Sequence, residues 1–84
     1  MTEIIVYGRP NCPMCNATQR ALKMKALSYV YLNLEADPAK AEEFKAAGYL
    51  TAPVVEVRQD GEVVETWAGF RHDRIKRWSR EADV

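Results

Sequence analysis

The sequence predicts an α/β fold with the element order βαβαββα, in which a four-stranded mixed sheet carries three helices. Two β-rich apolar runs, at residues 4–7 and 29–34, alternate with two segments rich in helix-forming residues. The dipeptide Asp60-Gly61 between two valine-rich runs is typical of a β-hairpin. A final segment with Ile75 and Trp78 at i and i+3 predicts the third helix. We expect residues 1–84 to form a single domain.

The first half of the chain is predicted to form a β-α-β unit. Ile4-Ile5-Val6-Tyr7 is apolar at every position, which favours a central strand covered on both faces. Residues 13 to about 26 are rich in good helix formers and predict the first helix. Its apolar stripe is predicted to be Ala17, Ala21 and Met24, extended by Leu22 and Leu27. Residues 29–34 predict a second strand, parallel to the first by the crossover rule.

The second helix is predicted to cover about Pro38 to Ala47. Asp37 supplies an N-cap acceptor, Pro38 is favourable at the first helical position, and Gly48 is the expected residue after the helix end. Ala41 and Phe44 are predicted to face inward.

The remaining elements are a hairpin and a helix. Residues 54–57 and 62–65 predict two strands, but a strict two-residue turn would set Glu56 opposite Glu65. We therefore expect a bulge or a longer loop. The third helix is predicted from Arg71 or His72 to Arg80.

Composition excludes several classes of protein. The chain is 48% hydrophobic and 29% charged, as in globular proteins, and its twelve basic and twelve acidic residues offer no general attraction to nucleic acid. No apolar run approaches the ~20 residues needed to span a bilayer, so no membrane association is expected. The first residues lack the features of a signal peptide. We expect a cytoplasmic protein and, as the simplest case, a monomer.

Charge is unevenly distributed along the chain. Residues 1–34 carry four basic and one acidic side chain, residues 35–66 three and eight, and residues 67–84 five and three. If the first and last segments share a face, the protein has one basic and one acidic side. The basic residues of the third helix are predicted to be mainly a solvated face, or alternatively to steer an acidic partner; they are Arg71, Arg74, Lys76, Arg77 and Arg80.

Cys12-Pro13-Met14-Cys15 is the motif that carries chemistry. It lies between a predicted strand and a predicted helix of a βαβ unit, a context that indicates a dithiol redox motif. Residues three apart on a helical turn have Cβ atoms ~5–6 Å apart, near the separation that a disulfide requires. Backbone N–H groups at the helix start favour a thiolate at Cys12, and neighbouring Arg9 adds to this effect. Cys12 is thus the predicted nucleophile, and Cys15 the resolving cysteine.

Three other interpretations of the cysteines carry less weight. They are inert thiols, a structural zinc site, and a metal cluster bridging two chains through Cys12 or Cys15. A structural zinc site wants four ligands, whereas the chain offers two cysteines and one histidine, His72. No metal site and no cofactor are expected.

Together these segments resemble the thioredoxin superfamily, in its glutaredoxin-like branch, and most closely the NrdH-redoxin family. The resemblance covers about residues 4–78. It is carried by the cysteine motif with the residues that follow it, by Gly48-Tyr49-Leu50-Thr51-Ala52-Pro53-Val54-Val55, and by Trp67-Ala68-Gly69-Phe70-Arg71-His72-Asp73. It implies a thioredoxin-like, glutaredoxin-type fold.

Membership of that family implies a dithiol electron donor. Its partners would be the large subunit of a class Ib ribonucleotide reductase and an NADPH-dependent thioredoxin reductase. The resemblance also implies that Pro53 is a cis-proline facing the dithiol and that the backbone of Ala52 pairs with a bound substrate segment. The residues expected to contact substrate or partner are Tyr7, Arg9, Pro13, Met14, Thr51, Ala52, Pro53, Trp67, Gly69 and Phe70.

Two departures from the family pattern leave alternatives open. Pro13-Met14 between the cysteines is closer to the glutaredoxin pattern, and His72 replaces a usual proline. A glutathione-dependent glutaredoxin is therefore the second candidate, although Arg71 places a cation where glutaredoxins carry an acid. A non-catalytic binding module is the third. For Tyr7 and Trp67, core packing is an equally weighted interpretation.

Overall fold

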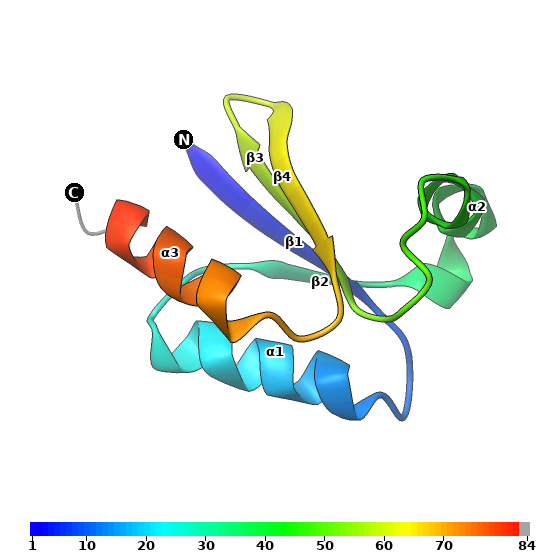
Figure 1. The fold of residues 1–84 in the computed structure, drawn as a ribbon, viewed down its shortest axis with the longest axis horizontal. Helices are drawn as coiled ribbons and strands as arrows, with labels where there is room; N and C mark the ends of the chain where they lie inside the picture. The colour runs from blue at the N-terminus through cyan, green and yellow to red at the C-terminus, as the bar shows by residue number, and fades with distance from the viewer. Residues whose placement is uncertain (83–84) are drawn as a thin grey trace.

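The structure has the predicted element order, with one short 3-10 helix, η1, added before the second α-helix (Figure 1). The computed structural model describes the backbone of residues 1–82 and the side chains of residues 1–79. The elements are β1 (Thr2–Gly8), α1 (Pro13–Met24), β2 (Val30–Asn33), η1 (Leu34–Ala36), α2 (Pro38–Ala46), β3 (Val54–Gln59), β4 (Glu62–Ala68) and α3 (His72–Ala82).

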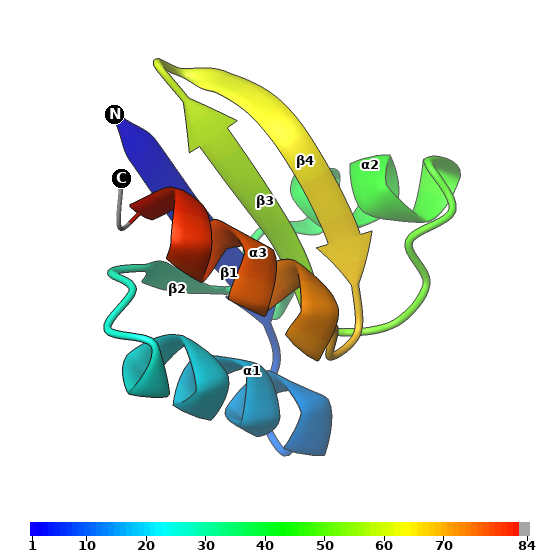
Figure 2. The same ribbon diagram turned by 60° about the vertical axis from the view of Figure 1, so that its left-hand side comes forward.

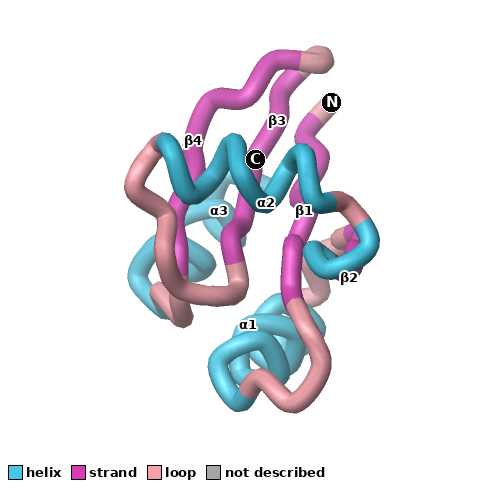
Figure 3. The backbone as a smooth tube through the Cα atoms, turned by 90° about the vertical axis from the view of Figure 1, so that its right-hand side faces the viewer, coloured by secondary structure: helices cyan, strands magenta, loops and turns pink. Residues whose placement is uncertain are grey.

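The four strands form one mixed sheet in the order β2-β1-β3-β4. β1 pairs in parallel with β2, which confirms the predicted crossover, and in antiparallel orientation with β3. Helices α1 and α3 lie side by side on one face of the sheet (Figure 2), whereas α2 crosses the opposite face (Figure 3). Within the part of the chain described, no helix is both long and apolar enough to cross a bilayer.

Each face of the sheet has its own hydrophobic core. The larger core, under α1 and α3, consists of Ile4, Val6, Leu22, Val55, Val57, Trp67, Ile75 and Trp78. The smaller core, under α2, consists of Tyr7, Phe44 and Val54. The predicted inward positions Ile75, Trp78 and Phe44 are thereby confirmed. Ile5 and Leu34 are among the partly buried residues that pack on the smaller core.

The hairpin combines the two-residue turn with the bulge that the sequence required. Asp60 and Gly61 both have positive φ angles, 54° and 87°, as hairpin turns of this kind demand. The register shifts between Val57 and Arg58, so Glu56 lies opposite Thr66 rather than Glu65. The repulsion predicted for a strict turn is avoided.

The apolar stripe predicted for α1 is buried only in part: Leu22 lies in the larger core and Ala21 and Leu27 pack on it, but Met24 does not. The fully buried side chains of α1 are Cys15, Thr18 and Leu22. Thr18 can be buried because its hydroxyl donates a hydrogen bond to the carbonyl oxygen of Met14 at 2.8 Å. Met24 is 81% exposed, so the prediction that it faces the core is wrong.

Local hydrogen bonds set the element boundaries. The second strand stops at Asn33, whose side chain accepts from the Glu35 amide at 2.9 Å and starts η1. The predicted N-cap Asp37 accepts from the Lys40 amide at 3.1 Å, and Gly48 has a φ of 93° after α2. At the other end of the chain, Glu65 accepts a hydrogen bond from Trp78 Nε1 at 2.6 Å, which ties α3 to β4.

A buried carboxylate, Glu56, lies under α2. It is 4% exposed, and it pairs with Arg58 Nη2 at 2.8 Å and with Lys40 Nζ at 3.2 Å. The Tyr7 hydroxyl donates to it at 3.4 Å. Burial raises the pKa of Glu56, but the hydrogen bonds from Arg58 and Lys40 outweigh burial and hold the pKa below its ordinary value of 4.5. The ion pair with Lys40 links α2 to the sheet.

We predict that this cluster makes stability depend on acid pH. The folded state lowers the pKa of Glu56, so its stabilisation is present above about pH 4.5 and is lost as pH falls through the lower folded value. Glu56→Gln should be less stable than the wild type at pH 7, and the difference should shrink towards pH 3. Urea denaturation across this range measures the free energies of unfolding of both proteins. A difference between them that does not depend on pH would show that the charge of Glu56 is not the source of the stabilisation.

A second prediction concerns Gly8, the last residue of β1. A Cβ atom at this position would lie 2.6 Å from Cζ of Tyr31, which packs on the larger core. Gly8→Ala should therefore cost about 1–3 kcal/mol through overpacking, although strands ordinarily favour alanine over glycine. The cost should largely disappear in a Tyr31→Ala background. Equal costs in both backgrounds, measured by chemical denaturation, would show that Tyr31 is not the obstacle.

Candidate functional site

The cysteine motif lies where β1 delivers the chain to α1. Cys12 is the N-cap of α1, with extended backbone (φ −116°), and Pro13 is the first helical residue. The amide of Cys15 donates a hydrogen bond to Cys12 Sγ at 3.1 Å. The predicted contact between helix start and sulfur is thus confirmed, and the positive end of the helix dipole favours negative charge on Cys12 Sγ.

The two cysteines form a disulfide, with their Cα atoms 5.1 Å apart. Cys15 is completely buried, whereas Cys12 is partly exposed. An incoming sulfur can therefore reach Cys12 but not Cys15. This difference matches the predicted order of action, in which Cys12 attacks and Cys15 resolves.

The loop before β3 lies against the disulfide. The Ala52–Pro53 peptide bond is cis, as the resemblance implied, and the Ala52 carbonyl oxygen is 3.8 Å from Cys12 Sγ. The carbonyl of Pro53 accepts a hydrogen bond from the Gly69 amide at 2.7 Å. Ala52 and Pro53 from the loop before β3 therefore meet Gly69 from the segment after β4, and this junction lies beside Cys12.

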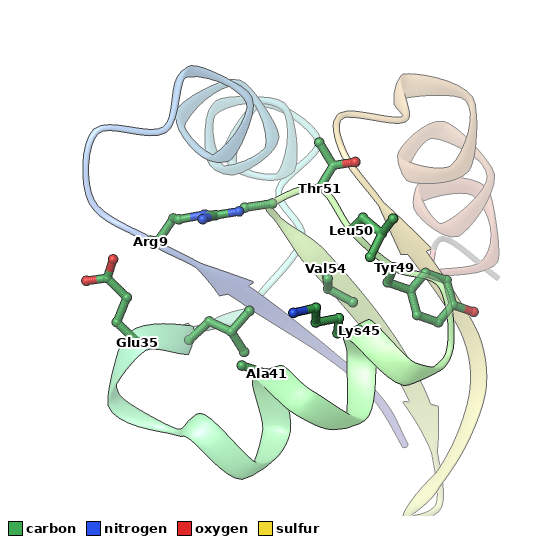
Figure 4. Close-up of a pocket in the computed structure, with 10 residues that line it drawn as sticks. Arg9, Glu35, Ala41, Lys45, Tyr49, Leu50, Thr51 and Val54 are labelled. Carbon is green, nitrogen blue, oxygen red and sulfur yellow. The ribbon is translucent and has the colours of Figure 1, made fainter.

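An open groove of about 280 Å³ runs from this loop to α2 (Figure 4). Arg9 comes from the loop after β1, Lys45 from α2, and Thr51 and Ala52 from the loop before β3. The other lining residues are Leu34, Glu35, Ala41, Tyr49, Leu50 and Val54. Two cations and one carboxylate thus border a mostly apolar hollow next to the disulfide. We call it the α2 groove.

Other predicted contact residues form an exposed rim around the disulfide. Met14 is 39% exposed and Phe70 is 38% exposed, and Pro13 and Thr51 are exposed as well. Gly69 is buried and close to Met14, since a Cβ atom on Gly69 would lie 3.7 Å from Met14 Sδ. The segments at residues 12–15 and 69–70 are therefore neighbours in space.

Two predicted contact residues do not lie on this surface. Trp67 is 3% exposed in the larger core, and Tyr7 is 5% exposed in the smaller one. The Tyr7 ring meets that of Phe44 edge-on, with centroids 5.1 Å apart. Both side chains pack in the cores, as the alternative interpretation of these residues predicted, because alternation along the strands turns both towards the helices.

Sequence reasoning missed several groove residues. Lys45 and Glu35 read as ordinary surface charges, and nothing in their spacing links them to the cysteines. Leu50 is 72% exposed immediately before Thr51, and this position in a motif that carries the resemblance is the only signal that could have indicated it.

The arrangement defines a thiol–disulfide redoxin of thioredoxin-like fold, because a partly exposed sulfur at a helix N-terminus can exchange with a disulfide and pass the bond to a buried neighbour. The Glutaredoxin family model matches residues 4–64. The chain belongs to the glutaredoxin family, and its relatives place it among the NrdH-type redoxins.

Curated relatives support this placement. The glutaredoxin-like protein NrdH of Salmonella typhimurium is 35% identical over 75 residues, covering 89% of this chain and 86% of the relative. An uncharacterised glutaredoxin-like 8.6 kDa protein from the rubredoxin operon of Clostridium pasteurianum is 31% identical over 73 residues, covering 86% of this chain and 91% of the relative.

Solved structures agree with the fold. The NrdH-redoxin of Escherichia coli, described as having a thioredoxin-like activity profile, superposes with a TM-score of 0.78 at 35% identity, covering 89% of this chain and 92% of that one. Thioredoxin of Fasciola hepatica, at 10% identity, has a TM-score of 0.73 and covers 95% of this chain and 79% of that one. The second match shows the shared fold alone.

We predict different outcomes for the two cysteine variants. Cys12→Ser should abolish reduction of a protein disulfide, because it removes the sulfur that solvent reaches. Cys15→Ser should accumulate a mixed disulfide on Cys12, because the resolving thiol is gone. Mass spectrometry under non-reducing conditions distinguishes these products. Normal turnover by Cys15→Ser on protein disulfides would show that the two-cysteine order is wrong.

Proposed function

We propose that the protein is a dithiol electron donor to the large subunit of a ribonucleotide reductase, and that an NADPH-dependent thioredoxin reductase restores its dithiol. The observation that carries the proposal is the pair formed by a reachable Cys12 and a buried Cys15 beside cis-Pro53. The NrdH relatives at 35% identity support the choice of partners.

The reaction balances as two sulfur exchanges. The Cys12 thiolate attacks one sulfur of the client disulfide, and the other client sulfur leaves as a thiolate that takes a proton. Cys15, losing its proton, then attacks Cys12 Sγ and releases the second client thiolate. Two electrons pass to the client, and the Cys12–Cys15 disulfide remains. Of the two protons that the client thiols take up, one is the proton lost by Cys15 and the other comes from water, which accepted the Cys12 proton when its thiolate formed. The reductase then supplies two electrons and two protons to the disulfide and restores the dithiol.

The surroundings of the disulfide support recognition of an extended client segment. In the proposed complex the client backbone pairs with Ala52, as in strand addition, while Met14, Thr51, Gly69 and Phe70 border it. Arg9 and Lys45 would favour a client with an acidic residue near its cysteine. A dithiol that must be kept reduced fits a cytoplasmic protein, because thiols are kept reduced in that compartment. The proposed protein is a single domain and acts as a monomer.

A glutathione-dependent glutaredoxin is the second candidate. The α2 groove favours it, because the two cations that line this groove, Arg9 and Lys45, suit a small anionic thiol. The segment after Gly69 opposes it, because Arg71 occupies the expected acidic position and Asp73 is already paired with Arg71 Nη2 at 3.1 Å.

Two coupled assays decide between these candidates. NADPH oxidation is followed with thioredoxin reductase in one arm, and with glutathione and glutathione reductase in the other, with a protein disulfide as acceptor. We expect turnover at least about tenfold faster in the first arm, with Cys12→Ser as the inactive control. Faster turnover in the glutathione arm selects the second candidate. The absence of turnover in both arms would leave a non-catalytic binding module.

A further inference from the structure

A second groove, on the opposite face of the sheet, lies between α1 and the start of α3. It measures about 340 Å³, and its lining residues are Ala17, Arg20, Ala21, Met24, Lys25, Phe70 and His72. Figure 2 shows that α1 and α3 lie side by side. We call it the α1–α3 groove.

The apolar side of this groove is the stripe of α1 that the sequence assigned to the core. Ala17, Ala21 and Met24 are spaced i, i+4 and i+7, so they lie along one side of the helix. The two alanines are only partly buried, and Met24 is 81% exposed. The 38% exposed ring of Phe70 lines the groove as well. This side of α1 is therefore half-buried at its alanines, with Ala21 packing on the larger core, and exposes the apolar side chain of Met24.

The polar border of the groove is positive. Three basic side chains, Arg20, Lys23 and Lys25, lie on α1 or directly after it, and α1 carries no acidic one. Arg20 and Lys25 line the groove, and neither takes part in an ion pair among the described residues. His72, the first residue of α3, adds an imidazole ring to the lining. The first and last segments of the chain share this face, which meets the condition stated above for a basic side.

We propose that the α1–α3 groove binds an acidic segment of a protein partner that inserts an apolar side chain between Met24 and Phe70. Unpaired cations beside an apolar stripe complement a segment that alternates carboxylates with apolar residues. Small alanines leave room for an apolar anchor. A nucleic acid would need stacking rings along its path, whereas the two rings in the lining, those of Phe70 and His72, come from one short segment.

The groove connects to the redox site through Phe70. Its neighbour Gly69 lies close to Met14, between the two cysteines. A partner whose cysteine reaches Cys12 can therefore continue along α1. The inference deepens the proposed function and rests on it, because the partner meant is the thioredoxin reductase that returns electrons to the dithiol.

The first experiment tests the groove without any redox chemistry. The Cys12→Ser/Cys15→Ser variant, labelled with nitrogen-15, is titrated with a peptide that has leucines at i, i+3, i+4 and i+7 and glutamates between them. We expect chemical shift changes of backbone amides that are confined to the groove residues. Arg20→Glu/Lys25→Glu should raise the Kd of the peptide about tenfold. Met24→Ser, which leaves charge unchanged, should also weaken binding because it removes the apolar contact.

A charge-reversed variant outside the groove and a single-stranded oligonucleotide serve as controls. Lys23→Glu/Lys76→Glu reverses two exposed cations outside the α1–α3 groove and should leave peptide binding nearly unchanged. Shifts elsewhere, equal losses in both charge-reversed variants, or equal binding of a single-stranded oligonucleotide at the groove would overturn the proposal.

The second experiment asks whether the redox partner uses the groove. In the thioredoxin reductase assay, Arg20→Glu/Lys25→Glu should raise KM about tenfold with little change in kcat, while its reduced form should reduce a small disulfide at the wild-type rate. An unchanged KM overturns the assignment of this partner to the groove. If the wild type shows no turnover with the reductase, the proposed function has failed, and the peptide titration alone judges the groove.

Discussion

The pairing of β1 on both of its edges is the constraint on which the site depends. β1 runs antiparallel to β3, so the end of β1 lies beside the start of β3, where Tyr7 is opposite Val54. Four residues after Tyr7 lead to Cys12, and the two residues before Val54 are Ala52 and Pro53. One sheet register therefore brings the sulfur within 3.8 Å of the Ala52 carbonyl oxygen. The cap hydrogen bond from Cys15 then fixes which sulfur is presented.

The two faces of the sheet are stabilised in different ways. Under α1 and α3 the core is almost entirely apolar, so its stability comes mainly from buried hydrophobic surface. Under α2 the helix contributes one buried side chain, Phe44, and the ion pair of Lys40 with Glu56 supplements it. A buried ion pair stabilises only while both charges are present, so this face is the more sensitive to acid. The α2 groove depends on the placement of that helix.

The redox centre lies between two grooves of different character. The α2 groove opens directly onto the Ala52 loop and includes a carboxylate, Glu35, along with its cations. The α1–α3 groove is bordered by cations and reaches the disulfide only through Phe70. A redoxin must receive electrons from one protein and pass them to another. In the proposed exchange, separate grooves would give the two partners different contacts while both use the same reachable sulfur, Cys12.

The amino-acid sequence by itself determined the order of elements, the caps and the chemistry, because these depend on contacts a few residues apart. The Cys12 cap, the Asp37 cap and the Asp60-Gly61 turn are all of this kind. Only the tertiary structure decided which side of α1 faces the core and that Tyr7 and Trp67 are buried. Periodicity shows that a helix has an apolar stripe, but Thr18 shows that a locally bonded polar residue can take the buried side. The same long-range packing exposed Met24 and joined Lys45, Arg9 and Thr51 around one groove.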